Sequence, residues 1–160
     1  MIDLCPRERP VMSDAHLIHS LLPARVPQQH AVHLALYVFR RMGAHGIEDA
    51  HAANALLGTF GLAYRRPLLV MRAMVLDLSK WSRRKIRLAG CCCRRMTADE
   101  ALLVEALLLA DQDPDHSEAL LAALLGSPHA MATLATVQAV SAAFCDAGHF
   151  LGPRPNWSRL

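Results

Sequence analysis

The sequence predicts an all-α fold, a compact bundle of five or six helices joined by short turns. Alanine and leucine dominate while aromatic residues make up only 5% of the chain, which is typical of helices packed against helices. Alternating runs of β-branched residues, the mark of strands, are almost absent. Apolar residues instead recur at helical spacing between glycines and prolines, in a globular composition that is 53% hydrophobic and 19% charged.

The 160 residues are enough for one domain with a substantial core. Prolines and weak periodicity predict a partly disordered arm at the start, with one short helical turn around "SDAHLIHSLL" capped by Ser13. Pro27 suits the first position of a helix, so the compact part begins there. We expect an N-terminal arm at 1–26, a single helical domain at 27–151 and a proline-rich C-terminal tail at 152–160.

The first half of the domain contains three expected helices. The first covers 27–42 and is ended by Gly43, and the second covers 48–60 with Asp49 in its first turn. The third opens at Pro67 and continues to Trp81, with apolar side chains on one face and basic side chains on the other. The segment "KIRLAGCCCRRM" that follows has no helical period and reads as a loop with a short extended piece.

Three more helices are expected in the second half. "TADE" is a capping box in which Thr97 and Glu100 satisfy each other's backbone N–H groups, and it starts the fourth helix. The fifth begins with Asp113 as its cap and ends at Gly126. The sixth begins with Ser127 as its cap and ends at Gly148.

Several function classes are disfavoured by the sequence. The N-terminus carries charges and no apolar h-region, so no secretory signal is expected. The uncharged run 119–145 is interrupted by "GSPH", which favours two soluble helices and no membrane partner. An odd number of cysteines, 5, indicates reduced thiols in the cytoplasm. Motifs for phosphate, dinucleotide, zinc-protease or serine-hydrolase chemistry are missing, so enzymatic activity stays uncertain and is not favoured.

Charge is strongly segregated along the chain. Between residues 65 and 95 the only acid is Asp77, whereas 96–150 contains no lysine or arginine. In one interpretation the two halves pack together and complement each other. In the other, the basic segment binds an acidic protein or another polyanion. The candidate partner-binding residues are Arg65, Arg66, Arg72, Lys80, Arg83, Arg84, Lys85, Arg87, Arg94 and Arg95.

The stretch 49–80 has the outline of a helix-turn-helix, so DNA is a possible partner. Only Arg65, Arg66 and Arg72 stand where a recognition helix reads base edges. The opposite face is aliphatic and offers no aromatic rings for stacking on bases. DNA binding is therefore the weakest of the binding hypotheses.

Cys91, Cys92 and Cys93 run into the positive amino end of the fourth helix beside two arginines, an environment that favours thiolate. They can be small apolar fillers between helices. They can also take part in a redox or thiol sensor. Consecutive cysteines poorly match tetrahedral geometry, so at most two of them can bind zinc, with His45, His51 or Cys145 completing the set. No cofactor is expected, and zinc remains possible.

Three segments, "FRRMGAHGIEDAHAANALLGTFG", "YRRPLLVMRA" and "CCCRRMT", resemble a small uncharacterised family of alphaproteobacterial proteins defined by a domain of unknown function. The resemblance covers 27–151 and leaves both termini outside. It implies a bacterial, cytosolic setting and no catalytic role for any residue.

The leading hypothesis is a non-enzymatic helical regulator or adaptor that binds an acidic partner through 65–95. The alternatives are a thiol or metal sensor that uses the cysteine triplet, and a DNA-binding regulator. The sequence does not indicate the oligomeric state.

Overall fold

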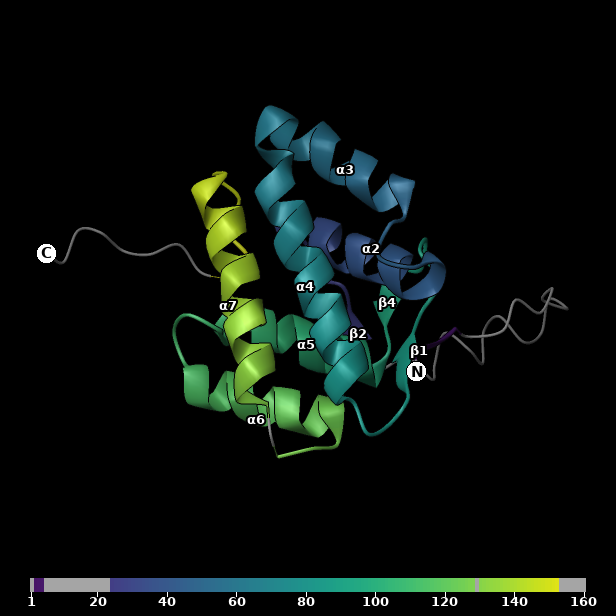
Figure 1. Ribbon diagram of the computed structural model, residues 1–160, viewed down its shortest axis with the longest axis vertical. Coiled ribbons are helices and arrows are strands. Elements are labelled where there is room, and N and C mark those ends of the chain that lie inside the picture. The colour runs from purple at the N-terminus through teal and green to yellow at the C-terminus, as the bar shows by residue number, and fades with distance from the viewer. Residues whose placement is uncertain (1, 5–23, 129, 153–160) are drawn as a thin grey trace, which may run out of the picture.

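The fold was obtained as a computed structural model, which describes residues 2–4, 24–128 and 130–152, with the backbone path alone for 2–4. It confirms the predicted all-α class (Figure 1). The expected turn capped by Ser13 and most of the expected C-terminal tail lie outside the described residues. The described helices are α2 (His30–His45), α3 (Ala50–Phe60), the 3-10 helix η1 (Gly61–Tyr64), α4 (Arg65–Trp81), α5 (Ala98–Leu109), α6 (Pro114–Leu125) and α7 (Met131–Asp146).

Helix α4 packs against α7, α2 and α3, whereas α5 and α6 pack most closely on each other. Figure 1 shows α4 and α7 side by side, with α3 at one end of α4 and with α5 and α6 toward its other end. Arg66 at the start of α4 forms an ion pair with Asp146 at the end of α7, so the two helices run antiparallel. Within the described part of the chain, no helix is both long and apolar enough to cross a membrane.

A single apolar core joins the six α-helices of the described residues. Phe39 and Met42 from α2 and Met71 from α4 are 1%, 2% and 0% exposed. Phe60, at the end of α3, meets Phe144 of α7 edge to face, with 5.0 Å between ring centroids. Helices distant in sequence are thus joined by close side-chain packing rather than by turns alone.

The expected helix boundaries are confirmed at α5 and α6. Thr97 accepts from the backbone N–H of Glu100 at 3.0 Å, and the Glu100 carboxylate accepts from the N–H of Thr97 at 2.9 Å. The Asp113 carboxylate caps α6, which ends at Gly126 in the left-handed conformation with φ 64°. Local side-chain chemistry determines both boundaries.

The boundaries of three other helices differ from the prediction. Helix α2 begins three residues after Pro27 and passes through Gly43 to end before Gly46, whose φ of 93° favours glycine. Helix α4 begins two residues before Pro67, in the first turn, where a missing N–H costs little. Helix α7 begins at Met131 rather than after Ser127, because the N–H of Ser127 still donates to the Ala122 carbonyl of α6.

Two short strand pairs confirm the extended piece expected after α4. Strand β1 (Ile2–Leu4) pairs in parallel with β3 (Ile86–Leu88), and β2 (Ala24–Arg25) pairs antiparallel with β4 (Arg95–Met96). Strand β3 precedes the cysteine-bearing segment and β4 follows it. The segment 89–94, called the cysteine loop below, is therefore held at both ends.

Candidate functional site

The cysteine loop is organised by Arg40, which extends from α2 and is only 3% exposed. Its guanidinium donates to the carbonyl oxygens of Cys93 at 2.7 Å, Arg95 at 2.9 Å and Gly90 at 3.3 Å. The loop also turns on itself, because the N–H of Cys93 donates to the carbonyl of Gly90 at 2.9 Å. One buried side chain thus fixes the backbone on both sides of the cysteine triplet.

Glu100 is the counterion of Arg40 and is completely buried. The pair is bidentate, with Nε–Oε1 2.7 Å and Nη2–Oε2 2.8 Å. The same carboxylate accepts from the backbone N–H groups of Ala89 and Thr97, each at 2.9 Å. The capping-box acid of α5 therefore also closes the base of the cysteine loop. Such a pair specifies geometry more than it stabilises, because desolvation offsets much of its attraction.

Asp99, the neighbour of Glu100, is also buried, at 6% exposed. It accepts from the guanidinium of Arg84 at 2.6 Å and from the backbone N–H of Arg87 at 2.7 Å. The Thr97 hydroxyl donates to the Arg87 carbonyl at 2.7 Å. The first turn of α5 thereby fixes the connection from α4 as well as the cysteine loop.

The cysteines are accessible. Cys92 is exposed, while Cys91 and Cys93 are half-buried, so the triplet is not sealed in the interior. The three residues line a cavity of about 360 Å³ together with His30, His33, Leu34, Leu36, Tyr37, Arg40, Arg94 and Val26. A fixed loop thus presents thiols beside imidazole, phenol and guanidinium groups.

Arg41, the neighbour of Arg40, lies between the cysteine loop and the start of α3. It forms a bidentate pair with Asp49, with Nε–Oδ1 3.1 Å and Nη2–Oδ2 2.6 Å. The hydrogen bond to Asp49 raises the pKa of Arg41 above its ordinary value, although desolvation acts to lower it. Cys91 adds a smaller contribution that also raises this pKa. The hydrogen bond from Arg41 lowers the pKa of Asp49 to about 2, although burial opposes the change. A permanent cation therefore stands close to one thiol of the triplet.

His45 and His51 do not join the cysteines. His45 is exposed at the end of α2 and His51 is exposed in the first turn of α3, and neither lines the cysteine cavity. Among the described residues, no three histidine, cysteine or acidic side chains are placed to hold a metal ion. The histidines that do line the cavity are His30 and His33, and their i, i+3 spacing on one helix is the one sign of them in the sequence.

The ten predicted partner-binding cations fall into different groups. Three of them contact acids of the same chain: Arg66 pairs with Asp146, Arg72 with Glu48 and Arg84 with Asp99. The ammonium of Lys80 lies 4.8 Å from the centre of the Trp81 ring, and Lys85 and Arg95 also have interaction partners. The remaining four are exposed and form no ion pair with any described residue: Arg65, Arg83, Arg87 and Arg94.

Both interpretations of the charge segregation therefore describe part of the structure. The pairs of Arg66 and Arg84 join the basic segment to the acidic half of the chain, as the complementary interpretation requires. The exposed and unpaired cations that remain are concentrated at the first turn of α4 and from Arg83 to Arg94. In the stretch that resembles a helix-turn-helix, η1 joins α3 to α4, and Arg72 also donates to the carbonyl of Ile47 at 2.9 Å.

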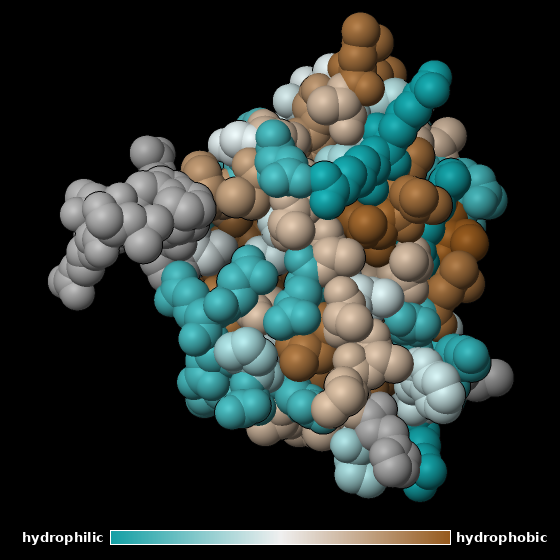
Figure 2. All heavy atoms as spheres, turned by 60° about the vertical axis from the view of Figure 1, so that its left-hand side comes forward, coloured by the Kyte–Doolittle hydropathy of each residue, from teal (hydrophilic) through white to brown (hydrophobic). Residues whose placement is uncertain are grey.

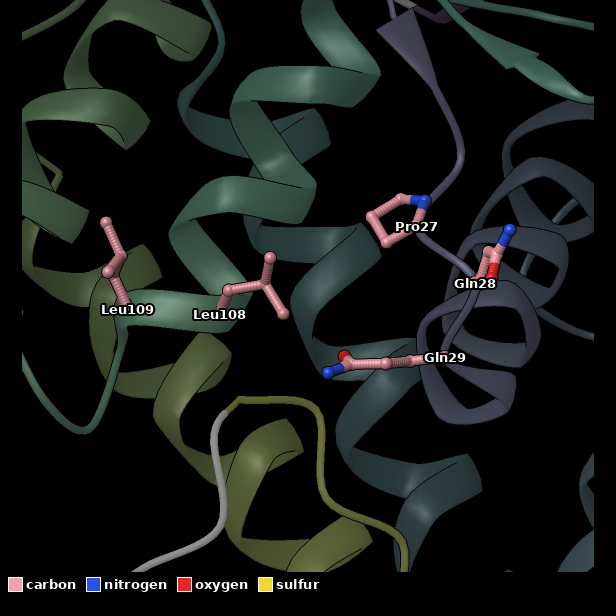
Figure 3. A pocket seen from close by; sticks show the side chains of 5 residues that line it. All are labelled: Pro27, Gln28, Gln29, Leu108 and Leu109. Carbon is pink, nitrogen blue, oxygen red and sulfur yellow. The ribbon is translucent and has the colours of Figure 1, made fainter.

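A larger hollow, of about 570 Å³, lies between the start of α2 and the end of α5. Figure 3 shows Gln29 and Leu108 reaching toward the same space from these two elements. Its lining is Pro27, Gln28, Gln29, Leu108 and Leu109, none of which titrates or acts as a nucleophile. The cysteine cavity is smaller but holds the reactive groups, so it is the better candidate site.

Comparisons with known proteins identify one family. The sequence profile of the family of unknown function DUF6628 matches residues 12–145. Comparisons with curated proteins and with solved structures gave no match. Because the matched residues make up most of the sequence, the chain belongs to this family of unknown function.

Proposed function

We propose that the protein is a non-enzymatic helical regulator or adaptor that binds an acidic partner through the basic segment 65–95. One observation carries the proposal. Arg83, Arg87 and Arg94 are exposed and form no ion pair with any described residue, in a segment whose only acid is Asp77. Unpaired cations on one segment create a positive potential that attracts and orients an anionic partner.

The backbone that carries these cations is rigid. The N–H of Arg83 donates to the Leu125 carbonyl at 2.8 Å, and the N–H of Arg87 donates to Asp99. The carbonyl of Arg94 accepts from the N–H of Val26 at 3.2 Å. The three side chains therefore extend from fixed positions, and binding requires ordering of side chains but not of the backbone.

The test replaces Arg83, Arg87 and Arg94 with serine and compares partner capture with that of the wild type. A matched variant, with Arg7, Arg9 and Arg25 replaced by serine, changes the net charge by the same amount outside the segment. Chemical crosslinking in the native cell, followed by purification and mass spectrometry, should recover an acidic protein with the wild type and the matched variant only. Capture that is equal in all three proteins would contradict the proposal.

Nucleic acid measured on the same purified samples distinguishes the DNA-binding alternative. A wild-type sample that retains DNA, and loses it steeply as salt rises, would favour a DNA-binding regulator. The cations engaged in ion pairs on α4 weaken this alternative, since Arg66 and Arg72 already contact carboxylates.

A second candidate function, a thiol sensor, is favoured by the exposure of Cys92 on a loop that Arg40 holds in place. A peroxide would transfer one oxygen to the Cys92 thiolate, giving a sulfenic acid and an alcohol or water. A neighbouring thiol would then displace water from that acid and form a disulfide. Serine at Cys91, Cys92 and Cys93 should remove the response and leave partner capture unchanged. Elemental analysis of the same samples tests the zinc version of this candidate.

We also propose a cytoplasmic setting in an alphaproteobacterium. The described cysteines are free thiols, which persist in reducing compartments, and the resemblance noted from the sequence points to such bacteria. Fractionation of a host cell into cytoplasm, periplasm and membrane tests this setting directly.

A further inference from the structure

The outer face of α4 exposes leucines at a regular interval. Leu69 is 68% exposed and Leu76 is 52% exposed, and they lie seven residues apart on one side of the helix. Leu62, in the adjoining η1, stands seven residues before Leu69 in the sequence and is 94% exposed at the end of α4 where that helix begins. Single exposed leucines are ordinary, whereas a row of them along one helix indicates an interaction surface.

The neighbouring helix extends this apolar face. Helix α7 runs antiparallel beside α4 and has no charged residue from Met131 to Cys145. Ala132, Ala135 and Ala142 are exposed on α7, and Met131 is 71% exposed. Figure 2, which turns this side of the molecule forward, shows a band of weakly and strongly apolar residues between hydrophilic side chains. Small side chains there allow a partner helix to approach the leucine row closely.

Cations lie along the same face. Arg65, one turn before Leu69, and Lys80, one turn after Leu76, are exposed and form no ion pair with any described acid. Arg66 and Arg72 contact carboxylates that are 58% and 77% exposed. Such solvent-exposed pairs are weak, so an incoming acidic group can replace them at little cost.

These charges disfavour a second copy of the chain as the occupant. Two α4 helices packed antiparallel about a two-fold axis would bring Arg65 of one copy toward Lys80 of the other. A parallel arrangement would bring each of these cations toward its own equivalent. Like charges that face each other across an interface are destabilising, so the face fits a partner of opposite charge.

We propose that the outer face of α4 binds an amphipathic helix of a partner protein. The apolar side of that helix contacts Leu62, Leu69 and Leu76, and acidic residues at its edges contact Arg65 and Lys80. This inference rests on the proposed function and names the acidic partner as a leucine-bearing helix. It extends the docking surface of the basic segment onto α4, next to the connection from Arg83 to Arg94.

The test selects binders of the purified full-length protein from a displayed library of helical 20-residue peptides. The library has leucines at heptad spacing and random residues at the flanking positions. The expected winners carry glutamate or aspartate at the flanks. Their affinity should fall about tenfold or more for the variant L69S/L76S, because two anchoring side chains are lost. The matched control L57S replaces another exposed leucine, on α3, and should bind like the wild type.

Each outcome decides between the two proposals. Winners that lack acidic flanks, winners that bind L69S/L76S unchanged, and a selection without enrichment each overturn the docking surface. If acidic winners lose binding only when Arg83, Arg87 and Arg94 are replaced by serine, the proposed function stands and the α4 surface is wrong. If the wild type sediments as a dimer and L69S/L76S as a monomer, a second copy occupies the face and the inference fails.

Discussion

Arg40 and Arg65 belong to neighbouring helices but meet opposite environments. Arg40 is 3% exposed and donates five hydrogen bonds, two of them to a completely buried carboxylate. Arg65 is exposed at the start of α4 and pairs with no described acid, beside a row of exposed leucines. One guanidinium determines the position of a loop, whereas the other remains available to a second molecule.

The comparison shows why charge segregation alone could not locate a binding surface. A buried arginine that supports the fold needs acceptors from the protein, because it has lost its hydrating water. An arginine that binds a partner must have no such acceptors in its own chain. Both kinds occur in this chain, within the tripeptides "RRM" and "RRP", which look alike in sequence. The two kinds of arginine differ only in the folded protein, where a carboxylate distant in sequence lies close to one of them and not to the other.

Removal of the buried guanidinium should cause the largest loss of stability. Arg40→Met removes the charged partner of the buried Glu100 carboxylate and the hydrogen bonds to the carbonyls of Gly90, Cys93 and Arg95. We expect a loss of about 3–5 kcal/mol in the free energy of unfolding. Urea denaturation followed by circular dichroism measures it. Arg94→Met, an exposed control, should change stability by less than about 0.5 kcal/mol. Equal effects for the two variants would show that Arg40 does not organise the loop.

A double variant tests whether Arg40 and Glu100 stabilise the protein as a pair. Glu100→Leu alone should destabilise the protein because it leaves Arg40 charged and buried. In the double variant, Arg40→Met should lower the free energy of unfolding by less than it does alone. The coupling free energy should be about 2 kcal/mol or more. Additive effects in the urea measurements would mean that the two side chains act independently.

The pair between Arg41 and Asp49 predicts a dependence of stability on pH. The pKa of Asp49 is about 2 in the folded protein, below its ordinary value of 3.8. The stabilisation is therefore complete above pH 4 and is lost as the pH falls toward 2, by about 1 kcal/mol after screening by solvent. Asp49→Asn keeps an acceptor for the helix cap and should flatten the stability curve in this window. An unchanged acid limb would contradict the role of the pair.

Thiol reactivity tests whether the cysteine loop is an accessible site. Cys92 should be alkylated about tenfold faster than the half-buried Cys145, because the reagent reaches the exposed sulfur more easily. Arg41→Gln should slow Cys91 and leave Cys92 unchanged. Isotope-coded alkylation of the native protein, read by mass spectrometry, gives each rate. Equal rates at all cysteines would remove the thiol-sensor candidate.

The smallest expected effect belongs to an exposed ion pair. Glu48→Gln removes the partner of Arg72, whose contact involves a carboxylate that is 77% exposed. We expect a change below about 0.5 kcal/mol in the free energy of unfolding, because solvent screens such pairs. A loss as large as that of Arg40→Met would erase the distinction between buried and exposed arginines.

Much of the fold could be predicted because its signals are local. The capping box of Thr97 and Glu100 and the cap at Asp113 involve residues three apart, so the sequence displays them directly. The continuation of α2 through Gly43 was missed, since packing against the core overrides the weak helix propensity of one glycine. The cap expected at Ser127 was wrong because that residue completes the end of α6.

The candidate site was only partly predictable. The triplet and its arginines are visible in the sequence, whereas the contribution of Arg40 depends on contacts across fifty to sixty residues. Glu100 was recognised as half of a capping box, but its second partner could not be inferred from spacing. The same limit applies to His30 and His33, whose cavity is completed by a loop from the other half of the domain.

The pair of Arg40 and Glu100 also has a consequence for when the growing chain can fold. The two residues are separated by 60 positions, so the ribosome releases the guanidinium roughly six seconds before its carboxylate at about 10 residues per second. During that interval α2 carries an uncompensated cation on the face that must later be buried. Burial of this face of α2 is therefore complete only after the start of α5 has been synthesised, and we expect the core to close late in translation.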